Sequence, residues 1–190
     1  MRKKIVLPSG LAFVLRPPEP QDVKQIYAAA CASRKELSPW MPWCHADYSE
    51  QDSANWIELC TKSWQDGTGF GFVMMDKAEA VCLGTGGLNH VNSQYRSANL
   101  GYWVNTSFAG QGIATAAARQ VAKFGFTEQN LMRIEILTDP ENKKSQRVAE
   151  KLGAVREGIK RNGLVYADDA RDAIRYSLIP SDLGKLAPEA

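Results

Sequence analysis

The sequence predicts a single mixed α/β domain that spans residues 1–190. Hydrophobic residues make up 44% of the chain and charged residues 23%, which is typical of a globular protein with one sizeable core. Apolar residues recur at helical spacing in some stretches and form short β-like runs in others. Because no repeat, low-complexity tract or long linker separates these stretches, we expect their elements to pack as layers around one shared core.

The chain should open with a strand or hairpin rather than a leader segment. Basic residues 2–4 precede the apolar stretch 5–15, as in a signal peptide, but Pro8, Ser9 and Gly10 interrupt that stretch. No small-residue cleavage site follows, and no later apolar run approaches the ~20 residues that a membrane helix requires. These features favour a cytoplasmic protein that makes no membrane contact.

Helical periodicity dominates the first third of the chain. We expect a strand at 11–16, a helix at 22–37, an ordered loop at 40–45 and a second helix from Ser49 to Asp66. Prolines stop the first strand, and Ser38-Pro39 ends the first helix. Ser49 with Asp52 resembles a capping box at the start of the second helix.

The remainder of the chain alternates strands with two more helices. We expect strands at 70–75, 81–91 and 99–104, a helix at 112–126, a strand at 133–138, a helix at 142–152, and final strands at 155–159 and 173–179. The closely spaced strands favour antiparallel pairing. Gly153 suits the left-handed position that ends a helix.

Charge and cysteine usage exclude several kinds of partner. The net charge of +2, from 23 Lys and Arg against 21 Asp and Glu, is too small to make nucleic acid the principal partner. The four cysteines lack a C-x-x-C pair, so they indicate neither a zinc site nor a disulfide framework. We therefore expect reduced thiols and no metal.

The turn from Gly110 to Thr115 predicts an anion site. A strand that leads directly into a helix leaves main-chain N–H groups unpaired at the positive end of the helix dipole. Gly110 and Gly112 allow an anion to approach this main chain closely. A dinucleotide fold would place glycine where Thr115 stands, and the Walker A string is absent. A glycine-containing connection without any ligand stays open when the turn is considered alone.

The surrounding motifs reveal a family resemblance that covers nearly the whole chain. They are Arg34–Trp43, Leu100–Val104, Gly110–Thr115, Asp139–Asn142 with Ser145, and Ala149–Gly153. In this order and spacing they resemble the GCN5-related N-acetyltransferases (GNAT), and among them the ribosomal-protein acetyltransferases of the RimJ and RimL kind. The resemblance implies a mostly antiparallel central sheet flanked by about four helices. Its fourth and fifth main strands, 99–104 and 133–138, would splay apart to admit the pantetheine arm of acetyl-CoA.

The same resemblance assigns the cofactor site. The implied cofactor-binding residues are Trp103, Val104, Gly110, Gln111, Gly112, Ile113, Ala114, Thr115, Asn142 and Ser145. Main-chain groups of the first two would pair with the arm, the turn would cradle the pyrophosphate, and the last two would lie near the sulfur. Ala109 departs from the Gln or Arg usual at its position; Arg119 or Lys144 is a substitute cation. A tyrosine that serves as the acid in some members is replaced by Ala149.

Acetyl transfer requires a neutral amine, a donor for the oxyanion and a hydrogen bond to the departing thiolate. Glu135 is the first candidate base, directly or through water; its alternative is an exposed carboxylate paired with a neighbouring Arg. The N–H of Val104 is the family-like oxyanion donor. Ser145 is the candidate donor to the thiolate, although Ser145 and Asn142 also suit the start of a helix.

The acceptor is the least constrained part of the prediction. Trp40 and Trp43 would form a wall over it or pack in the core, and His90 is a further candidate contact. The leading hypothesis is transfer to a protein N-terminus, with a ribosomal protein as the family-suggested target, by a monomer or homodimer. The alternatives are a small amine, such as an amino acid, polyamine or antibiotic, and a catalytically silent acyl-CoA sensor.

Overall fold

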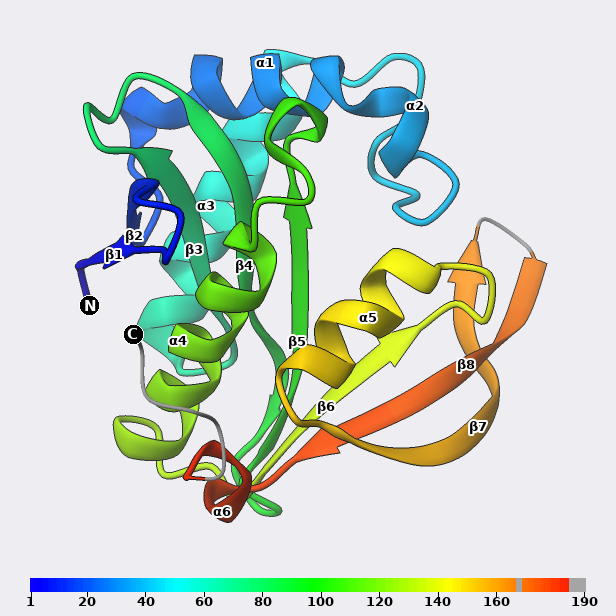
Figure 1. Cartoon of the computed structure of the whole chain (residues 1–190). Coiled ribbons are helices and arrows are strands. Elements are labelled where there is room, and N and C mark those ends of the chain that lie inside the picture. Colours follow the sequence, from blue (N-terminus) through cyan, green and yellow to red (C-terminus); the bar gives the residue numbers. More distant parts are fainter. Residues whose placement is uncertain (167–168, 185–190) are drawn as a thin grey trace.

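The computed structural model describes residues 1–166 and 169–184, so the remaining residues of the predicted domain lie outside the described part. Eight strands form one sheet in the order β1-β2-β3-β4-β5-β6-β8-β7 (Figure 1). They are β1 (Lys3–Val6), β2 (Ala12–Arg16), β3 (Phe70–Asp76), β4 (Cys82–Asn92), β5 (Ser97–Val104), β6 (Arg133–Thr138), β7 (Val155–Tyr166) and β8 (Asp169–Leu178). The mostly antiparallel sheet that the sequence predicts is confirmed.

Helices cover both faces of the sheet. The α-helices are α1 (Val23–Ala32), α2 (Arg34–Leu37), α3 (Glu50–Asp66), α4 (Ile113–Thr127), α5 (Lys143–Lys151) and α6 (Pro180–Leu183), with 3-10 turns η1 (Pro20–Asp22) and η2 (Thr106–Phe108). In the described residues, α1, α3, α4 and α5 are the helices of nine residues or more, as expected. No described helix is long and apolar enough to span a bilayer.

The two faces have separate cores, which follow from the alternation of side chains along β3. Phe70, Phe72 and Met74 join the cluster that contains α4, whereas Val73 and Met75 join the cluster that contains α1 and part of α3. Figure 1 shows α4 and α5 in front of the sheet and α3 behind it. We call these sides the α4 face and the α3 face.

The sheet opens between β5 and β6. These strands pair in parallel only where Ser97, Ala98 and Asn99 meet residues 133–135. Beyond that point β6 remains paired with β8 as far as Thr138, whereas β5 follows β4 to Val104. The predicted splay of these two strands is therefore confirmed, and it leaves the β6 side of residues 100–104 without a strand partner among the described residues.

Three predicted elements differ from the structure, and one of them is the last strand, expected at 173–179, which begins already at Asp169. The helix expected at 22–37 is interrupted at Ser33, whose buried hydroxyl accepts a hydrogen bond from Thr106 N at 2.9 Å. This long-range contact fixes the break, and its partner lies just after β5. The strand expected at 155–159 continues to Tyr166, because a hairpin with β8 extends through register shifts near Gly158 and Asn162, both at positive φ.

Candidate functional site

The glycine turn before α4 has the geometry of an anion cradle. Gly110 and Gly112 have φ of 80° and 86°, and Gly112 is the N-cap of the 15-residue helix α4. No side chain in the described part of the chain caps that N-terminus. A Cβ added at Gly110 would meet no atom within 4 Å, so the main chain is open to a ligand. Unpaired N–H groups and the helix dipole suit a phosphate group here.

The end of β5 borders this turn. Trp103 and Val104 pair with Thr85 and Gly84 of β4, and their other edge faces the opening toward β6. Main-chain groups along such an edge can pair with an extended chain, as an added strand would. Trp103 is buried, whereas Val104 is half-buried.

The first turn of α5 lies across the opening. Asn142 caps this helix, because its side-chain oxygen accepts a hydrogen bond from Ser145 N at 3.0 Å. The Tyr102 hydroxyl reaches across from β5 and donates to the Ser145 carbonyl oxygen at 3.1 Å, and it lies 3.3 Å from Ser145 Oγ. Burial raises the pKa of Tyr102 to about 12. The structure thus brings Val104, Tyr102 and Ser145 to one opening.

Sequence reasoning assigned no role to the Tyr102 side chain. The signal was the alternation in Asn99–Val104, in which Leu100, Tyr102 and Val104 share the face that packs on α4. A hydroxyl on an otherwise apolar face requires a polar partner.

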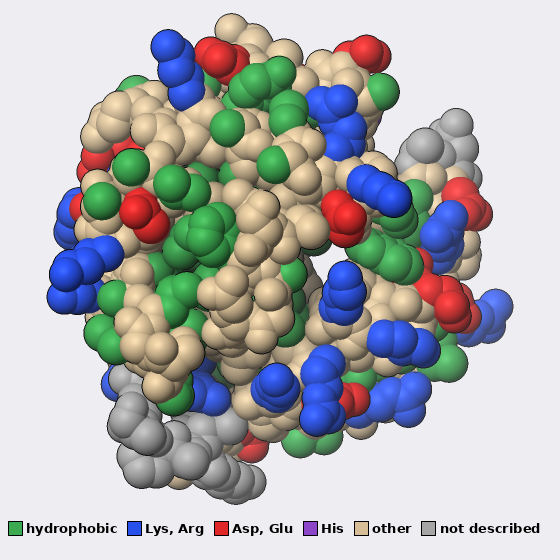
Figure 2. Space-filling model, turned by 45° about the horizontal axis from the view of Figure 1, so that its top comes forward, with side chains coloured by type: hydrophobic (Ala, Val, Ile, Leu, Met, Phe, Trp, Pro, Cys, Tyr) green, Lys and Arg blue, Asp and Glu red, His purple; other side chains and the backbone are tan. Residues whose placement is uncertain are grey.

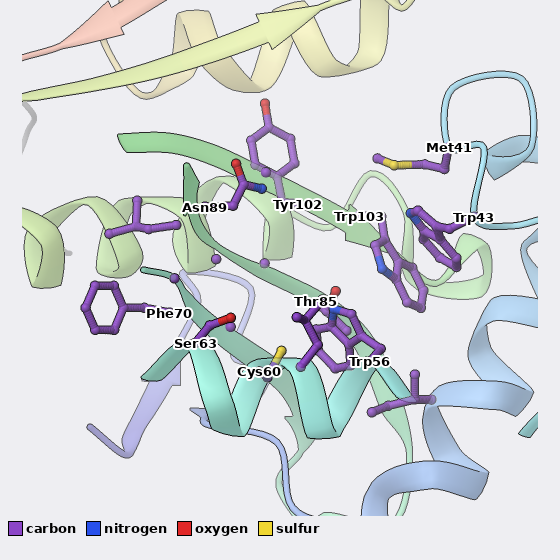
Figure 3. A pocket seen from close by; sticks show the side chains of 18 of the residues that line it. Met41, Trp43, Trp56, Cys60, Ser63, Phe70, Thr85, Asn89, Tyr102 and Trp103 are labelled. Carbon is purple, nitrogen blue, oxygen red and sulfur yellow. The ribbon is translucent and has the colours of Figure 1, made fainter. Parts of the chain in front are cut away.

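A cavity of 510 Å³ lies on the α3 face, between α3 and the strands β3 to β5. Its floor is a row of glycines, since Gly71 pairs with Gly87 and Gly87 pairs with Gly101 in adjacent strands. Side chains of α3 such as Trp56, Cys60 and Ser63 form the opposite wall (Figure 3). At Gly101 the missing side chain leaves open space, because a Cβ there would have only Asn89 Nδ2, at 3.7 Å, within 4 Å, whereas Gly71 and Gly87 allow close packing against Cys60 and Phe70.

Aromatic side chains close one end of the cavity. The Trp43 and Trp103 rings lie 5.7 Å apart, and Tyr48 contacts Trp43 at 5.4 Å (Figure 3). These rings line the cavity, whereas Trp40 lies outside its lining. Of the two tryptophans that the sequence analysis singled out, the structure therefore brings only Trp43 to the cavity.

Few polar groups line the cavity. Asn89 lines the cavity, and its side-chain oxygen accepts a hydrogen bond from Asn99, outside the lining, at 2.9 Å. Asp52 accepts hydrogen bonds from the Ser49 hydroxyl and N–H, which lowers the pKa of its carboxyl. His45 lines the cavity, whereas His90, at the end of β4, does not.

Glu135 lies on the opposite side of β6 from Ile134 and Ile136, which belong to the α4-face core. Its carboxylate is ion-paired with Arg133 at 2.7 Å, and Arg133 also binds Glu157 at 2.6 Å. Glu135 therefore has the pairing with a neighbouring Arg that the sequence offered as the alternative to a role as the catalytic base.

Positive charge gathers around α5. The nine-residue helix α5 carries four basic residues, Lys143, Lys144, Arg147 and Lys151, and one acidic residue, Glu150. Figure 2 shows basic side chains on this side of the molecule. Such a surface suits a ligand with several phosphates. In residues 1–166 and 169–184, no group of three or more metal-ligating side chains is close enough to hold a metal ion.

Three curated proteins are similar to the chain over most of its length. It is 29% identical to YdaF of Bacillus subtilis over 167 residues, covering 85% of this chain and 87% of that protein. It is 27% identical to spermidine N(1)-acetyltransferase of Escherichia coli, covering 90% and 88%. It is 25% identical to the ribosomal-protein-serine acetyltransferase of Escherichia coli, covering 83% and 87%.

The fold also matches a solved acetyltransferase structure. RimJ of Mycobacterium smegmatis, in complex with CoA-disulfide, superposes with a TM-score of 0.86 at 26% identity, covering 96% of this chain and 88% of that one. Residues 13–155 match the family described as Acetyltransferase (GNAT) domain. This family uses acetyl-CoA as acyl donor. With its splayed sheet, its open glycine cradle and a family match over most of its length, the chain belongs to the GNAT acetyltransferases.

Proposed function

We propose that this enzyme is a cytoplasmic, single-domain N-acetyltransferase that transfers the acetyl group of acetyl-CoA to the N-terminal amino group of a protein, such as a ribosomal protein. One observation carries the proposal: β5 borders an opening with an anion cradle on one face and an aromatic cavity on the other. A donor in the opening and an acceptor in the cavity would meet at this strand.

The residues of the opening suit acetyl-CoA. Main-chain N–H groups from Gly110 to Thr115 would hold the pyrophosphate, and the exposed turn leaves room for it. Main-chain groups of Trp103 and Val104 would pair with the pantetheine arm. Ala109 offers no cation, but the Lys144 side chain on the first turn of α5 is a substitute. Bound acetyl-CoA supplies a thioester, which is an activated acyl group.

The remaining steps require stabilisation of the oxyanion and of the departing thiolate, and removal of a proton from the amine. The N–H of Val104 would stabilise the oxyanion, and Ser145 would donate to the sulfur. An attacking N-terminal amine has a pKa of ~7.7–8.0, so a substantial fraction is already neutral near pH 7.5. The Glu135 carboxylate is engaged by Arg133 at 2.7 Å, and water is then the more suitable first acceptor of the proton.

The cavity favours a peptide terminus over a polyamine. A polyamine site would need an acidic cleft, for which Asp47, Glu50 and Asp52 are the neighbouring acidic residues. Of these three, only Asp52 lines the cavity. The Asp52 carboxylate already accepts hydrogen bonds at the start of α3. A polycation would therefore find little charge here, whereas the aromatic walls suit the side chains of a peptide terminus.

The test is acetyl transfer to a panel of amines, followed by mass spectrometry and thiol release. We expect peptides with free N-termini to be acetylated, N-terminally blocked copies to be inert, and spermidine to react at least tenfold more slowly in kcat/KM. Faster transfer to spermidine than to every peptide would assign the small-amine function instead. Binding of acetyl-CoA without thiol release for any amine would identify a silent sensor.

A further inference from the structure

Tyr102 connects the two walls of the opening at a defined point. It lies three residues beyond Asn99, the last β5 residue that pairs with β6. Tyr102 borders the cavity, and Figure 3 shows its ring extending from β5 toward α5. There its hydroxyl lies 3.1 Å from the carbonyl oxygen of Ser145 and 3.3 Å from Ser145 Oγ. The position that carries tyrosine in some relatives is Ala149, which is fully buried on the same helix and has no hydroxyl to offer.

We propose that Tyr102 is a positioning residue that holds the Ser145 hydroxyl ready to donate a hydrogen bond to the thiolate leaving acetyl-CoA. This inference rests on the proposed function. The phenol has one hydrogen, which it donates to the Ser145 carbonyl oxygen at 3.1 Å, and this bond fixes the first turn of α5 against β5. Ser145 Oγ is thereby held 3.3 Å from the Tyr102 hydroxyl, where its own hydrogen can turn toward the thiolate.

The proton balance assigns positioning rather than acid catalysis to Tyr102. In the transfer, a nitrogen–carbon bond forms, the carbon–sulfur bond breaks, and its electron pair goes to sulfur. The proton that the attacking amine releases balances the thiol product. Burial raises the pKa of Tyr102 to about 12, well above the ~8.5 of an ordinary thiol, so proton transfer from the phenol to the thiolate is unfavourable. Tyr102 therefore keeps its proton and acts through Ser145.

The experiment measures the acidity of the CoA thiol when CoA is bound to the protein. Thiolate absorbance is titrated between about pH 6 and 9.5 for the wild type, Tyr102→Phe, Ser145→Ala and the double variant, each against protein without CoA. We expect Tyr102→Phe to raise the pKa of the bound thiol by about 0.5–1, a threefold to tenfold loss of thiolate stabilisation. Ser145→Ala should raise it at least as much, and the double variant no further.

Tyr176→Phe is the matched control. Tyr176 is a buried tyrosine of β8 in the same α4-face core, so this variant also removes one buried hydroxyl. The thiol of CoA bound to the Tyr176→Phe variant should have the same pKa as in the wild type. If the thiol of CoA bound to Tyr102→Phe had the same pKa as in the wild type, the inference would be overturned. Additive effects of the two substitutions on this pKa would also overturn it, because they would mean that Tyr102 acts without Ser145. Failure of the wild type to bind CoA would instead overturn the proposed function.

Discussion

At the scale of single residues, the alternating direction of side chains along β5 separates the residues of the acceptor cavity from the residue that contacts α5 beside the donor site. Gly101, Tyr102 and Trp103 all border the cavity, but the Tyr102 hydroxyl between the other two is directed to Ser145 of α5. Substitutions at neighbouring positions should therefore affect different substrates. The glycine row adds a second distinction, because Gly87 is surrounded by backbone and Gly101 by open space.

Gly101→Ala should fill the cavity floor without disturbing the fold. Its Cβ would have Asn89 Nδ2, at 3.7 Å, as its nearest neighbour, which is an ordinary contact. We expect the acceptor KM to rise about tenfold and the acetyl-CoA KM to stay unchanged in steady-state kinetics. Gly87→Ala is the contrast, since its Cβ would lie 2.5 Å from Phe70 O; urea unfolding should show a loss of ~1–3 kcal/mol. An unchanged acceptor KM in Gly101→Ala would remove the glycine row from the acceptor site.

At the scale of elements, two irregular parts of the chain are held by different forces. The loop at 38–49 is anchored by packing, since Cys44 and Tyr48 are buried and the Trp43 ring packs against Trp103 at a tilt of 47°. The β7–β8 hairpin is instead tied to β6 by charge, because Glu157 binds Arg133 and Arg175 and accepts a hydrogen bond from Ser177. The loop should control the acceptor, and the charge network should control stability.

Trp43→Ala should impair acceptor use and leave the donor site intact. Trp43 is 37% exposed and lies at the rim of the core, and its loss removes one aromatic wall of the cavity. We expect kcat/KM for the peptide to fall about tenfold or more, with acetyl-CoA affinity unchanged by calorimetry. Trp40→Ala is the matched control, because Trp40 lies outside the cavity lining, and it should retain peptide kinetics. Equal losses in both variants would contradict a specific wall at Trp43.

Glu157→Gln should reveal an acid-sensitive contribution of the hairpin. The hydrogen bonds from Arg133 lower the pKa of Glu157 to about 2, below its ordinary value of ~4.3. A depressed pKa means that the stabilisation is complete above the ordinary value and disappears as the pH falls toward 2. Because the Glu157 side chain is partly exposed, solvent screens these interactions, and urea unfolding should show the variant less stable by about 1 kcal/mol at pH 7, with the difference shrinking below pH 4. A difference independent of pH would contradict this account.

At the scale of the whole molecule, the sheet consists of two antiparallel blocks joined by a short parallel contact. Strands β1 to β5 form one block and β6, β8 and β7 the other. Only three residue pairs join β5 to β6 within the described sheet, so the blocks diverge beyond Asn99. The opening is thus a consequence of topology, and both proposed substrates lie along one strand.

Local patterns in the sequence predicted much of this arrangement, whereas long-range contacts were not predictable. Helical spacing and the glycines before α4 act within a few residues, so the helices and the cradle were expected. The break at Ser33 depends on Thr106, and the glycine floor depends on strand register, both of which need the folded chain. The exposed, polar β7 lacks the apolar alternation that would have shown its length.

The central claim is that the opening between β5 and β6 binds acetyl-CoA through the cradle before α4. Calorimetric titration of acetyl-CoA into the wild type and Gly112→Asp tests it most directly, since the new carboxylate would occupy the N–H groups meant for the pyrophosphate and repel it. Gly67→Asp, at another exposed glycine with positive φ of 68°, controls for backbone strain. We predict saturable binding by the wild type and Gly67→Asp, and a loss of about a hundredfold or more in Gly112→Asp. Equal affinity in Gly112→Asp and the wild type, or no binding by either, would contradict the claim.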